Sequence, residues 1–255
     1  MYDFKIKLAE KIINISALYL ETRHFCQDYL SNETADFSIK IEETDINSER
    51  IKSAQEDEKQ GISTRHFSDA YLETLAVYRK IATIMPRYDV LLFHGSVIAV
   101  DEKGYLFTAP SGTGKSTHTR LWMEKFKEHA YMVNDDKPLL KIGETVIAYG
   151  TPWDGKHHLS KNTSVPLQGI CILHQAKENH IERIDESEAL VAIMQQIYHP
   201  IDDSQAYLQT LKLTDKLLKS VPLYKMGCNI SQEAVELAYK TMKSIDLNKI
   251  RKGKN

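Results

Sequence analysis

The sequence predicts an α/β protein. Three observations lead to this class. Short apolar runs with strand character alternate with segments of helical periodicity along most of the chain. The stretch FTAPSGTGKSTHTRLW, residues 107–122, places a glycine-rich turn between an apolar run and an amphipathic segment. A further apolar run then ends in the acidic stretch YMVNDDKP, residues 131–138. The order strand, turn, helix, strand is the repeating unit of α/β folds.

Composition sets limits on the partners. The chain has 255 residues, enough for one large domain or one domain with a small appendage. The formal net charge is −2, so no basic field indicates nucleic acid. Three widely spaced cysteines argue against a disulfide framework. There is no apolar signal core at the N-terminus and no apolar run long enough for a membrane span. We therefore expect a cytoplasmic protein with no nucleic-acid or membrane partner.

Residues 1–85 are expected to form an α+β region, either separate from or integral to the fold of residues 86–255. Residues 3–8 and 37–43 alternate at the strand period, whereas residues 13–30 are ambiguous. The acidic stretch 42–58 predicts a solvated helix or loop. Residues 69–89 give the clearest helix, which Pro86 ends, and its apolar stripe comprises Leu72, Leu75, Ala76, Ile81 and Met85.

Residues 86–255 continue the alternation of strands and helices. Strand-like runs occupy 90–100, 103–109 and 131–135, with a helix over 117–130. Residues 138–150 predict a hairpin around Gly143, and 167–175 and 180–184 predict two more strands. The C-terminal part is expected to be mostly helical, with helices over 187–199, 204–220 and 231–244.

The glycine-rich turn predicts a phosphate site. APSGTGKS, residues 109–116, fits the phosphate-binding loop pattern with Ala109 in place of the usual first glycine. Gly112 and Gly114 permit the backbone angles that turn successive N–H groups inward, and the next helix adds its positive N-terminal end. Lys115 supplies a cation for the β- and γ-phosphates, and Ser116 a hydroxyl ligand for Mg²⁺. The residues expected around the polyphosphate are Ser111, Gly112, Thr113, Gly114, Lys115, Ser116 and Thr117.

Asp135 and Asp136 form a second signal, twenty residues after Lys115. If the strand–helix–strand unit returns parallel, both strands end at one sheet edge, beside the phosphate loop. Two carboxylates beside a triphosphate require Mg²⁺ between them. One aspartate is thus expected to hold the metal, and the other to accept a proton from an incoming hydroxyl. One strand earlier, His94 interrupts an apolar run and is a further candidate for the site.

This ordered set (HG at 94–95, SGTGKS at 111–116, DD at 135–136) resembles the catalytic domain of HPr kinase/phosphorylase and, more distantly, phosphoenolpyruvate carboxykinase. The resemblance is specific over residues 90–140 and looser to about 185, and residues 1–85 do not resemble the N-terminal domain of HPr kinase. It implies a carboxykinase/HPr kinase-like P-loop domain with a mixed β-sheet and C-terminal helices. It also implies that His94 stands near the γ-phosphate, and it favours Asp135 as the base and Asp136 as the metal ligand. Relatives of this kind assemble, so a homo-oligomer is possible.

The chain departs from that pattern in one respect. HPr kinase has a downstream arginine that stabilises the transferring phosphoryl group, but here Arg183 is the only arginine between Asp136 and Arg251. The loop GTPWDGKHHLSKNTSVPL, residues 150–167, is long enough to be functional. In it, Lys156 or Lys161 is a candidate phosphate clamp, and Trp153 a candidate wall for the acceptor. The change argues against HPr itself as the acceptor.

Together these features predict an ATP- and Mg²⁺-dependent kinase that phosphorylates a hydroxyl, of serine type, on a protein, peptide or small molecule. The alternative is a nucleotide-binding accessory or sensor module without phosphate transfer. Carboxykinase-like decarboxylation is disfavoured, because no additional Arg and Lys set for a dicarboxylate is found.

Overall fold

The structure is a computed structural model that describes residues 1–59, 61–155 and 158–243. The chain divides into two compact units, Met1–Ile84 and Met85–Asn255. Within the described ranges, every helix is too short or too polar to traverse a lipid bilayer.

The first unit combines a three-stranded sheet with helices. Its elements are β1 (Tyr2–Leu8), β2 (Lys11–Ala17), α1 (Leu20–Phe25), a 3-10 turn (Gln27–Tyr29), β3 (Phe37–Lys40), α2 (Glu43–Lys59) and α3 (Asp69–Ile84). The sheet order is β1-β2-β3, antiparallel between β1 and β2 and parallel between β2 and β3. The expected strands and helices are confirmed. The ambiguous segment 13–30 is divided between the end of β2, helix α1 and the 3-10 turn.

A buried carboxylate ties α1 to α3 within this unit. Glu73 is fully buried and accepts hydrogen bonds from the backbone N–H of Leu18 (2.5 Å) and of Tyr19 (3.0 Å), and from the hydroxyl of Thr22. It thereby satisfies donors at the N-terminus of α1, where the N-cap residue makes no side-chain hydrogen bond.

The second unit contains a mixed sheet. Its strands are β4 (Val90–Leu92), β5 (Ser96–Val100), β6 (Lys103–Thr108), β7 (Ala130–Asn134), β8 (Leu139–Ile142), β9 (Val146–Tyr149), β10 (Ser164–Gln175), β11 (His180–Ile184) and β12 (Leu223–Cys228). They run in the order β4-β8-β9-β10-β6-β5-β7, with β12 between β10 and β11. The pairs β10–β6 and β10–β12 are parallel, and the other pairs are antiparallel.

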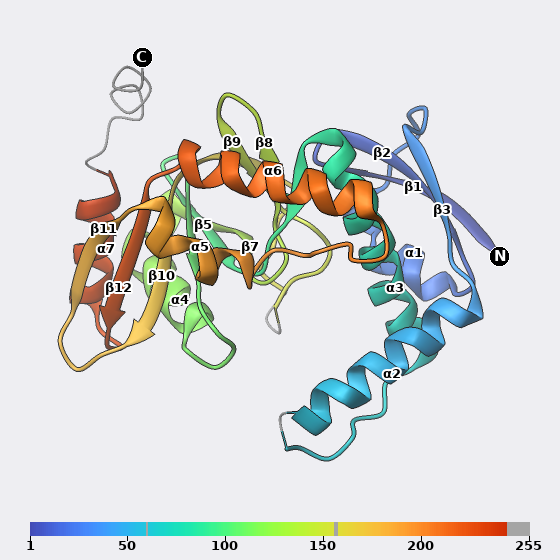
Figure 1. Ribbon diagram of the computed structural model, residues 1–255, viewed down its shortest axis with the longest axis horizontal. Coiled ribbons are helices and arrows are strands. Elements are labelled where there is room, and N and C mark those ends of the chain that lie inside the picture. Colours follow the sequence, from blue (N-terminus) through green and yellow to red (C-terminus); the bar gives the residue numbers. More distant parts are fainter. Residues whose placement is uncertain (60, 156–157, 244–255) are drawn as a thin grey trace. The chain divides into compact units, whose positions relative to one another are not determined.

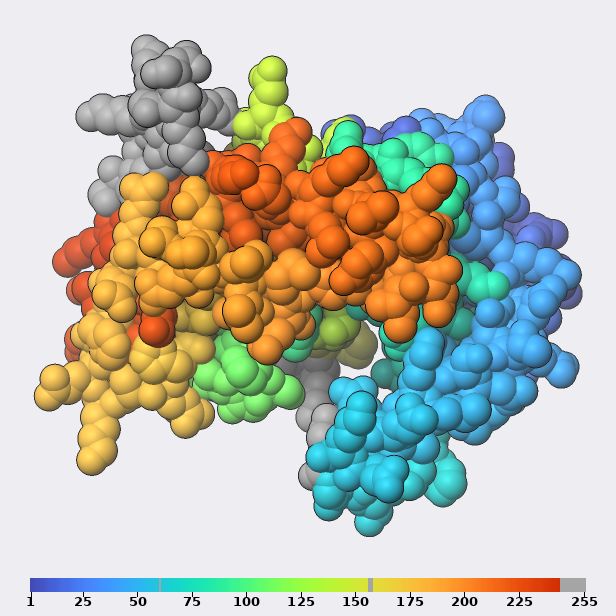
Figure 2. Space-filling model, viewed as in Figure 1, coloured from blue at the N-terminus to red at the C-terminus, as the bar shows by residue number. Residues whose placement is uncertain are grey.

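Helices cover both faces of this sheet (Figure 1). They are α4 (Lys115–Phe126), α5 (Glu186–Met194), α6 (Ser204–Ser220) and α7 (Gln232–Lys243), with 3-10 turns at Met85–Tyr88 and Lys127–His129. Side chains of β5 alternate between two cores: Val97 packs in the core beneath α5 and α6, and Ile98 in the core beneath α4 and α7. A sheet buried on both faces explains why its central strands are continuously apolar. The outer surfaces of α5 and α6 are seen in orange in Figure 2.

Two strand expectations need correction. The segment 90–100 is not one strand, because β4 pairs with β8 while β5 pairs with β6 and β7. The chain breaks between them at His94 and Gly95, where a Cβ on Gly95 would lie 3.0 Å from the carbonyl oxygen of Phe107. The C-terminal part, expected to be mostly helical, also contains the strand β12. This strand lies between β10 and β11, which therefore do not pair with each other.

The strand order brings three chain segments to one sheet edge. β5 runs antiparallel to both β6 and β7 and lies between them. The carboxyl ends of β6 and β7 and the start of β5 therefore lie at the same edge. The parallel orientation expected for β6 and β7 is confirmed, although the two strands are not adjacent.

An aromatic cluster anchors α4 beneath that edge. The indole N–H of Trp122 donates to Nε2 of His118 at 3.0 Å, and the His118 ring meets Phe107 edge-on at 4.7 Å between centroids. Trp122 and Phe107 are fully buried and His118 is nearly so. Burial lowers the pKa of His118 to about 4, so the helix packs with a neutral imidazole.

We predict that His118 makes the fold sensitive to mild acid. An unfolded histidine gains its proton near pH 6.5, whereas folded His118 stays neutral to about pH 4. Unfolding takes up a proton in this interval, so the free energy of unfolding falls as the pH falls, by roughly 3 kcal/mol in all. Urea unfolding of wild type and His118→Gln across this interval measures the difference.

His129→Gln is the matched control, because the His129 side chain is 65% exposed. The variant His118→Gln should lose part of the acid sensitivity and His129→Gln should keep it. An identical pH dependence in wild type and His118→Gln would contradict the buried neutral state.

Candidate functional site

The glycine-rich loop leads directly into α4. Gly112 and Gly114 have φ angles of +79° and +111°, a region that side chains disfavour. Gly114 is the N-cap of α4, and a glycine has no side chain that could accept a hydrogen bond from the first N–H groups of the helix. The loop residues Ser111 and Gly112 are exposed, as is Ser116 in the first turn of the helix. Such an uncapped helix start suits an anion.

Lys115 folds back across the loop. Its Nζ donates to the carbonyl oxygen of Ala109 at 2.9 Å, which joins the two ends of the turn. The side chain is only 9% exposed. Burial lowers the pKa of Lys115 below its ordinary value, while the carboxylates of Asp136 and Asp135 oppose the shift. Both aspartates are therefore close enough to interact with the lysine electrostatically.

Asn134 shapes the turn that carries the aspartates. Its Oδ1 accepts the backbone N–H of Asp136 (2.9 Å) and of Lys137 (2.6 Å). Its Nδ2 donates to the carbonyl oxygens of Thr151 (3.2 Å) and Trp153 (3.3 Å). Because Asn134 is fully buried, these bonds fix the turn to the loop that follows β9.

Asp135 is held from two sides. Ser96, at the start of β5, donates to its Oδ1 at 2.9 Å and to its carbonyl oxygen at 3.1 Å. Gly155 lies against the same carboxylate, since a Cβ at that glycine would lie 2.6 Å from Oδ2. Asp135 itself is only 5% exposed.

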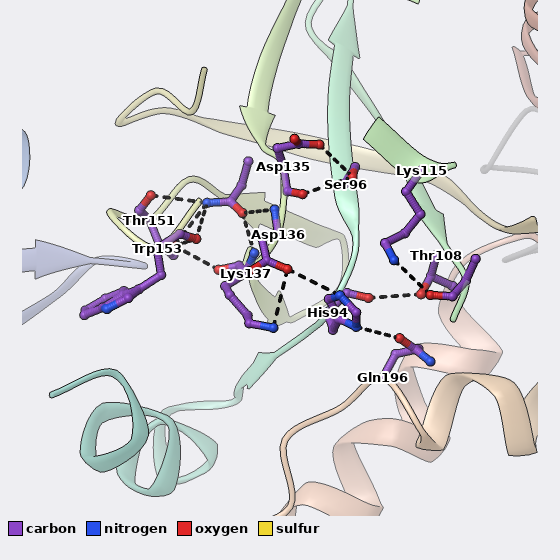
Figure 3. A network of polar contacts seen from close by, with 12 residues as sticks. His94, Ser96, Thr108, Lys115, Asp135, Asp136, Lys137, Thr151, Trp153 and Gln196 are labelled. Atoms are coloured by element: carbon purple, nitrogen blue, oxygen red, sulfur yellow. Dashed lines mark hydrogen bonds and ion pairs between the residues drawn. The ribbon is translucent and has the colours of Figure 1, made fainter. Parts of the chain in front are cut away.

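Asp136 belongs to a second network, which Figure 3 shows. Its Oδ1 lies 3.3 Å from Nε2 of His94 and 3.4 Å from Nζ of Lys137. Nδ1 of His94 contacts Oε1 of Gln196 at 3.0 Å, and the hydroxyl of Thr108 donates to the His94 carbonyl oxygen at 3.0 Å. The imidazole is thus oriented between the end of α5 and the aspartate turn.

These partners keep Asp136 ionised. Burial alone raises the pKa of its carboxyl group. The hydrogen bond from His94 and the charge of Lys137 outweigh that effect, so the net pKa lies below the usual value.

Two cavities lie on either side of the first turns of α4, and both are lined by Thr117. The first, which we call the loop cavity, has a volume of about 460 Å³ and is lined by Gly112, Thr113, Gly114, Thr117, His118, Leu121, Gln175, Ala176, Cys228, Asn229 and Ile230. The second, the aspartate cavity, has a volume of about 340 Å³ and is lined by Ser116, Thr117, Arg120, Met123, Met132, Asp135 and Leu159. Asp135 and Ser116 thus face one space, as the expected edge arrangement requires.

Two of the expected clamp and wall residues, Lys161 and Trp153, do not line these cavities. Lys161 lies over the ring of Tyr131, 5.1 Å from its centroid, and lines neither cavity. Trp153 is buried; in Figure 3 its indole extends away from His94 and Lys115, while its backbone carbonyl oxygen accepts a hydrogen bond from Asn134. Lys156 lies outside the described residues.

Sequence reasoning missed four residues of this region. Arg120 could have been found, because it follows Ser116 by four residues on a predicted helix and so shares its face. Ser96 follows the His–Gly pair, and Asn134 precedes the aspartates, but no pattern assigned them a role. Gln196 lies 102 residues from His94 and carries no local signal.

Several side chains at this edge of the sheet carry oxygen atoms that could bind a metal ion. Among the described residues, no group of three or more His, Cys, Asp or Glu side chains is arranged to hold a metal ion by itself. The hydroxyl of Ser116 and the two carboxylates are hard ligands of the kind that Mg²⁺ takes when phosphate and water complete its shell.

Comparison with solved structures finds a distant similarity to the HPr(Ser) kinase/phosphatase from Coxiella burnetii. The identity is 12% and the TM-score 0.34, over 60% of this chain and 99% of that chain. Nothing about the site rests on a similarity at this level. Comparison with curated proteins gives no match.

A family model, SynChlorMet cassette protein ScmC, matches residues 64–240. The matched region includes the glycine-rich loop, both aspartates and both cavities. Because the match covers more than two thirds of the sequence, the chain belongs to the ScmC family of SynChlorMet cassette proteins.

Proposed function

We propose that this protein is an ATP- and Mg²⁺-dependent kinase that transfers the γ-phosphoryl group to a hydroxyl of an acceptor. The observation that carries the proposal is the shared cavity, in which the helix-start residue Ser116 and the carboxylate of Asp135 face the same space. A phosphate held at the start of α4 would thus lie beside a carboxylate able to take a proton.

The glycine-rich loop is the proposed phosphate site, in the manner of a P-loop. Residues Ser111 to Thr117 present backbone N–H groups, and Lys115 exchanges the Ala109 carbonyl oxygen for phosphate oxygens. Mg²⁺, when bound, supplies charge neutralisation between the phosphates, with the hydroxyl of Ser116 and the carboxylate of Asp136 as its protein ligands. The lowered pKa of Asp136 suits that role, because a ligand carboxylate must be ionised.

Asp135 is the proposed base. The acceptor oxygen forms a bond to the γ-phosphorus while its proton passes to the Asp135 carboxylate. The bond between the γ-phosphorus and the bridging oxygen breaks, and ADP leaves. His94 orients Asp136 through their contact of 3.3 Å and stands at the same edge. Such a reaction asks the protein chiefly for positioning and charge stabilisation.

The loop cavity is the proposed site of the nucleoside. It opens beside Gly112 and Gly114, and its walls combine the apolar side chains of Leu121 and Ile230 with the polar side chains of Gln175 and Asn229. Apolar walls with a few polar groups are usual for the base of a nucleotide. At the level of fold, we propose a carboxykinase/HPr kinase-like domain.

We predict that Lys115→Met weakens binding of both ATP and inorganic tripolyphosphate. The substitution keeps the buried stem but removes the cation that would contact the phosphates. Loss of charge-assisted hydrogen bonds should raise both dissociation constants about 10- to 100-fold, measured by calorimetry. Lys103→Met, at the opposite end of β6, is the matched control and should bind as wild type. Unchanged binding by Lys115→Met would refute the phosphate site.

We predict that Ile230→Ser distinguishes binding of the nucleoside from binding of the phosphates. Ile230 is 79% exposed, so the fold should tolerate the change. Affinity for ATP should fall about tenfold through lost apolar contact with the base, while affinity for tripolyphosphate stays the same. If the affinities for ATP and for tripolyphosphate fell equally, or if neither changed, the nucleoside would bind elsewhere.

We predict different effects for the two aspartates. Asp135→Asn removes the base and should lower kcat at least about 100-fold without changing the Mg²⁺ concentration for half-maximal activity. Asp136→Asn removes a metal ligand and should raise that concentration, so that excess Mg²⁺ restores part of the activity. Transfer of label from ATP to the small molecules and proteins of a cell extract provides the assay.

Asp101→Asn, in the turn at the far end of β5 and β6, is the control for charge loss. If Asp136→Asn lowered kcat and Asp135→Asn changed the Mg²⁺ requirement instead, Asp136 would be the base and Asp135 the metal ligand. A protein that binds ATP but transfers phosphate to nothing in the extract would be an accessory or sensor module.

A further inference from the structure

Arg120 projects from the one helix that lines both proposed substrate spaces. It follows Ser116 by four residues on α4, so the two side chains share a helix face. Both line the aspartate cavity, on whose wall Asp135 also lies. An arginine and an aspartate thus line one small space, on a face of α4 adjacent to the one that lines the proposed nucleoside site.

The guanidinium is available to a ligand. Its recorded ion pair joins Nε to Oε1 of Glu124 at 3.8 Å, longer than a good hydrogen bond. Both side chains are more than half exposed, at 59% and 55%, and exposed pairs one helical turn apart are weak. A carboxylate or phosphate can therefore replace Glu124 and take two parallel hydrogen bonds from the planar fork.

The remaining wall of the cavity is apolar. It comes from Met123 on α4, Met132 on β7 and Leu159. Methionine side chains adapt to varied shapes. The volume of about 340 Å³ lies at the lower end of the range for small-molecule pockets.

From this arrangement we propose that the phosphate acceptor is a small hydroxyl compound that carries a carboxylate or phosphate group. The proposal rests on the kinase function above and names its acceptor class. The acceptor hydroxyl lies at Asp135, which takes its proton as the oxygen forms its bond to the γ-phosphorus of ATP. The anionic group pairs with Arg120, and the products are a phosphomonoester and ADP.

Electrostatics favour this class over a neutral acceptor. An anionic acceptor approaching a triphosphate is repelled, and a guanidinium in the cavity wall offsets that repulsion. With a neutral acceptor Arg120 keeps Glu124 and water as its partners, so the acceptor gains no charge-assisted hydrogen bonds from the guanidinium.

The experiment uses the full chain, labelled ATP, Mg²⁺ and matched pairs of acceptors. Each pair differs in one charged group: glycerate and glyceramide, 3-hydroxybutyrate and its amide, glycerol 3-phosphate and glycerol. We expect at least one anionic member to be phosphorylated, with kcat/KM about tenfold or more above that of its neutral counterpart.

The variants show whether Arg120 binds the acceptor. Arg120→Ala should raise KM for the anionic acceptor about tenfold and leave kcat within about twofold, and Arg120→Lys should recover part of the loss. Arg183→Ala is the matched control, because it removes the same charge from an exposed position on β11 and should behave as wild type.

Other outcomes overturn the proposal. Equal kcat/KM for an acid and its neutral counterpart would show that the acceptor needs no charged group. A fall in kcat for every acceptor with KM unchanged would make Arg120 a stabiliser of the transferring phosphoryl group instead. Transfer to a protein of a cell lysate, but to none of the small acids, refutes this acceptor class and leaves the kinase intact. Absence of transfer to any acceptor refutes both.

Discussion

The position of β5 is the constraint on which the site depends. An antiparallel strand between β6 and β7 has its start where they have their ends. Three segments that come from different parts of the chain therefore meet at one edge of the sheet. They are the His–Gly break, the glycine-rich loop and the aspartate turn. The hydroxyl of Ser96 fixes this meeting, because its one proton is shared between the carboxylate and the carbonyl oxygen of Asp135. Without β5 in that place, Asp135 would lose its hydrogen bond from Ser96 and would keep only its contacts from other segments, such as that with Gly155.

Charge balance explains why so many ionisable groups tolerate partial burial here. Lys115, Asp136 and Lys137 lie near one another and alternate in sign, with His94 in contact with the central carboxylate. The charge of Asp136 offsets part of the desolvation of Lys115, and His94 and Lys137 offset the desolvation of Asp136. With Asp135 included, the two lysines and two aspartates are balanced in charge, and a bound polyanion would add negative charge that the Mg²⁺ proposed above would offset.

Much of this organisation follows from local patterns. The helix α3 has a clear apolar stripe and a terminating proline, and the strand–loop–helix at Gly112 and Gly114 combines periodicity with glycines at the required angles. The proximity of Asp135 to Ser116 follows from the parallel return of β7. Such features depend on residues near one another in the chain, where period and turn chemistry act directly.

What the sequence could not predict depends on pairing at long range. β12 lies between two helical segments and is short, so its pattern LYKMGC gives no strong period, and only its neighbours β10 and β11 make it a strand. The contact of His94 with Gln196 joins segments that share no motif. Lys161 was expected near phosphate because of its charge, but its side chain lies over Tyr131, a partner that no spacing indicates.

The bond between Lys115 and the carbonyl oxygen of Ala109 has a consequence for selectivity. At rest the ammonium already has an internal partner, so an arriving anion must compete for it rather than meet a bare charge. A single weak anion gains little from that exchange, whereas a chain of phosphates that also satisfies the amides of the loop gains from several contacts at once. If the loop binds phosphate as proposed, this internal hydrogen bond would favour multivalent anions over monovalent ones.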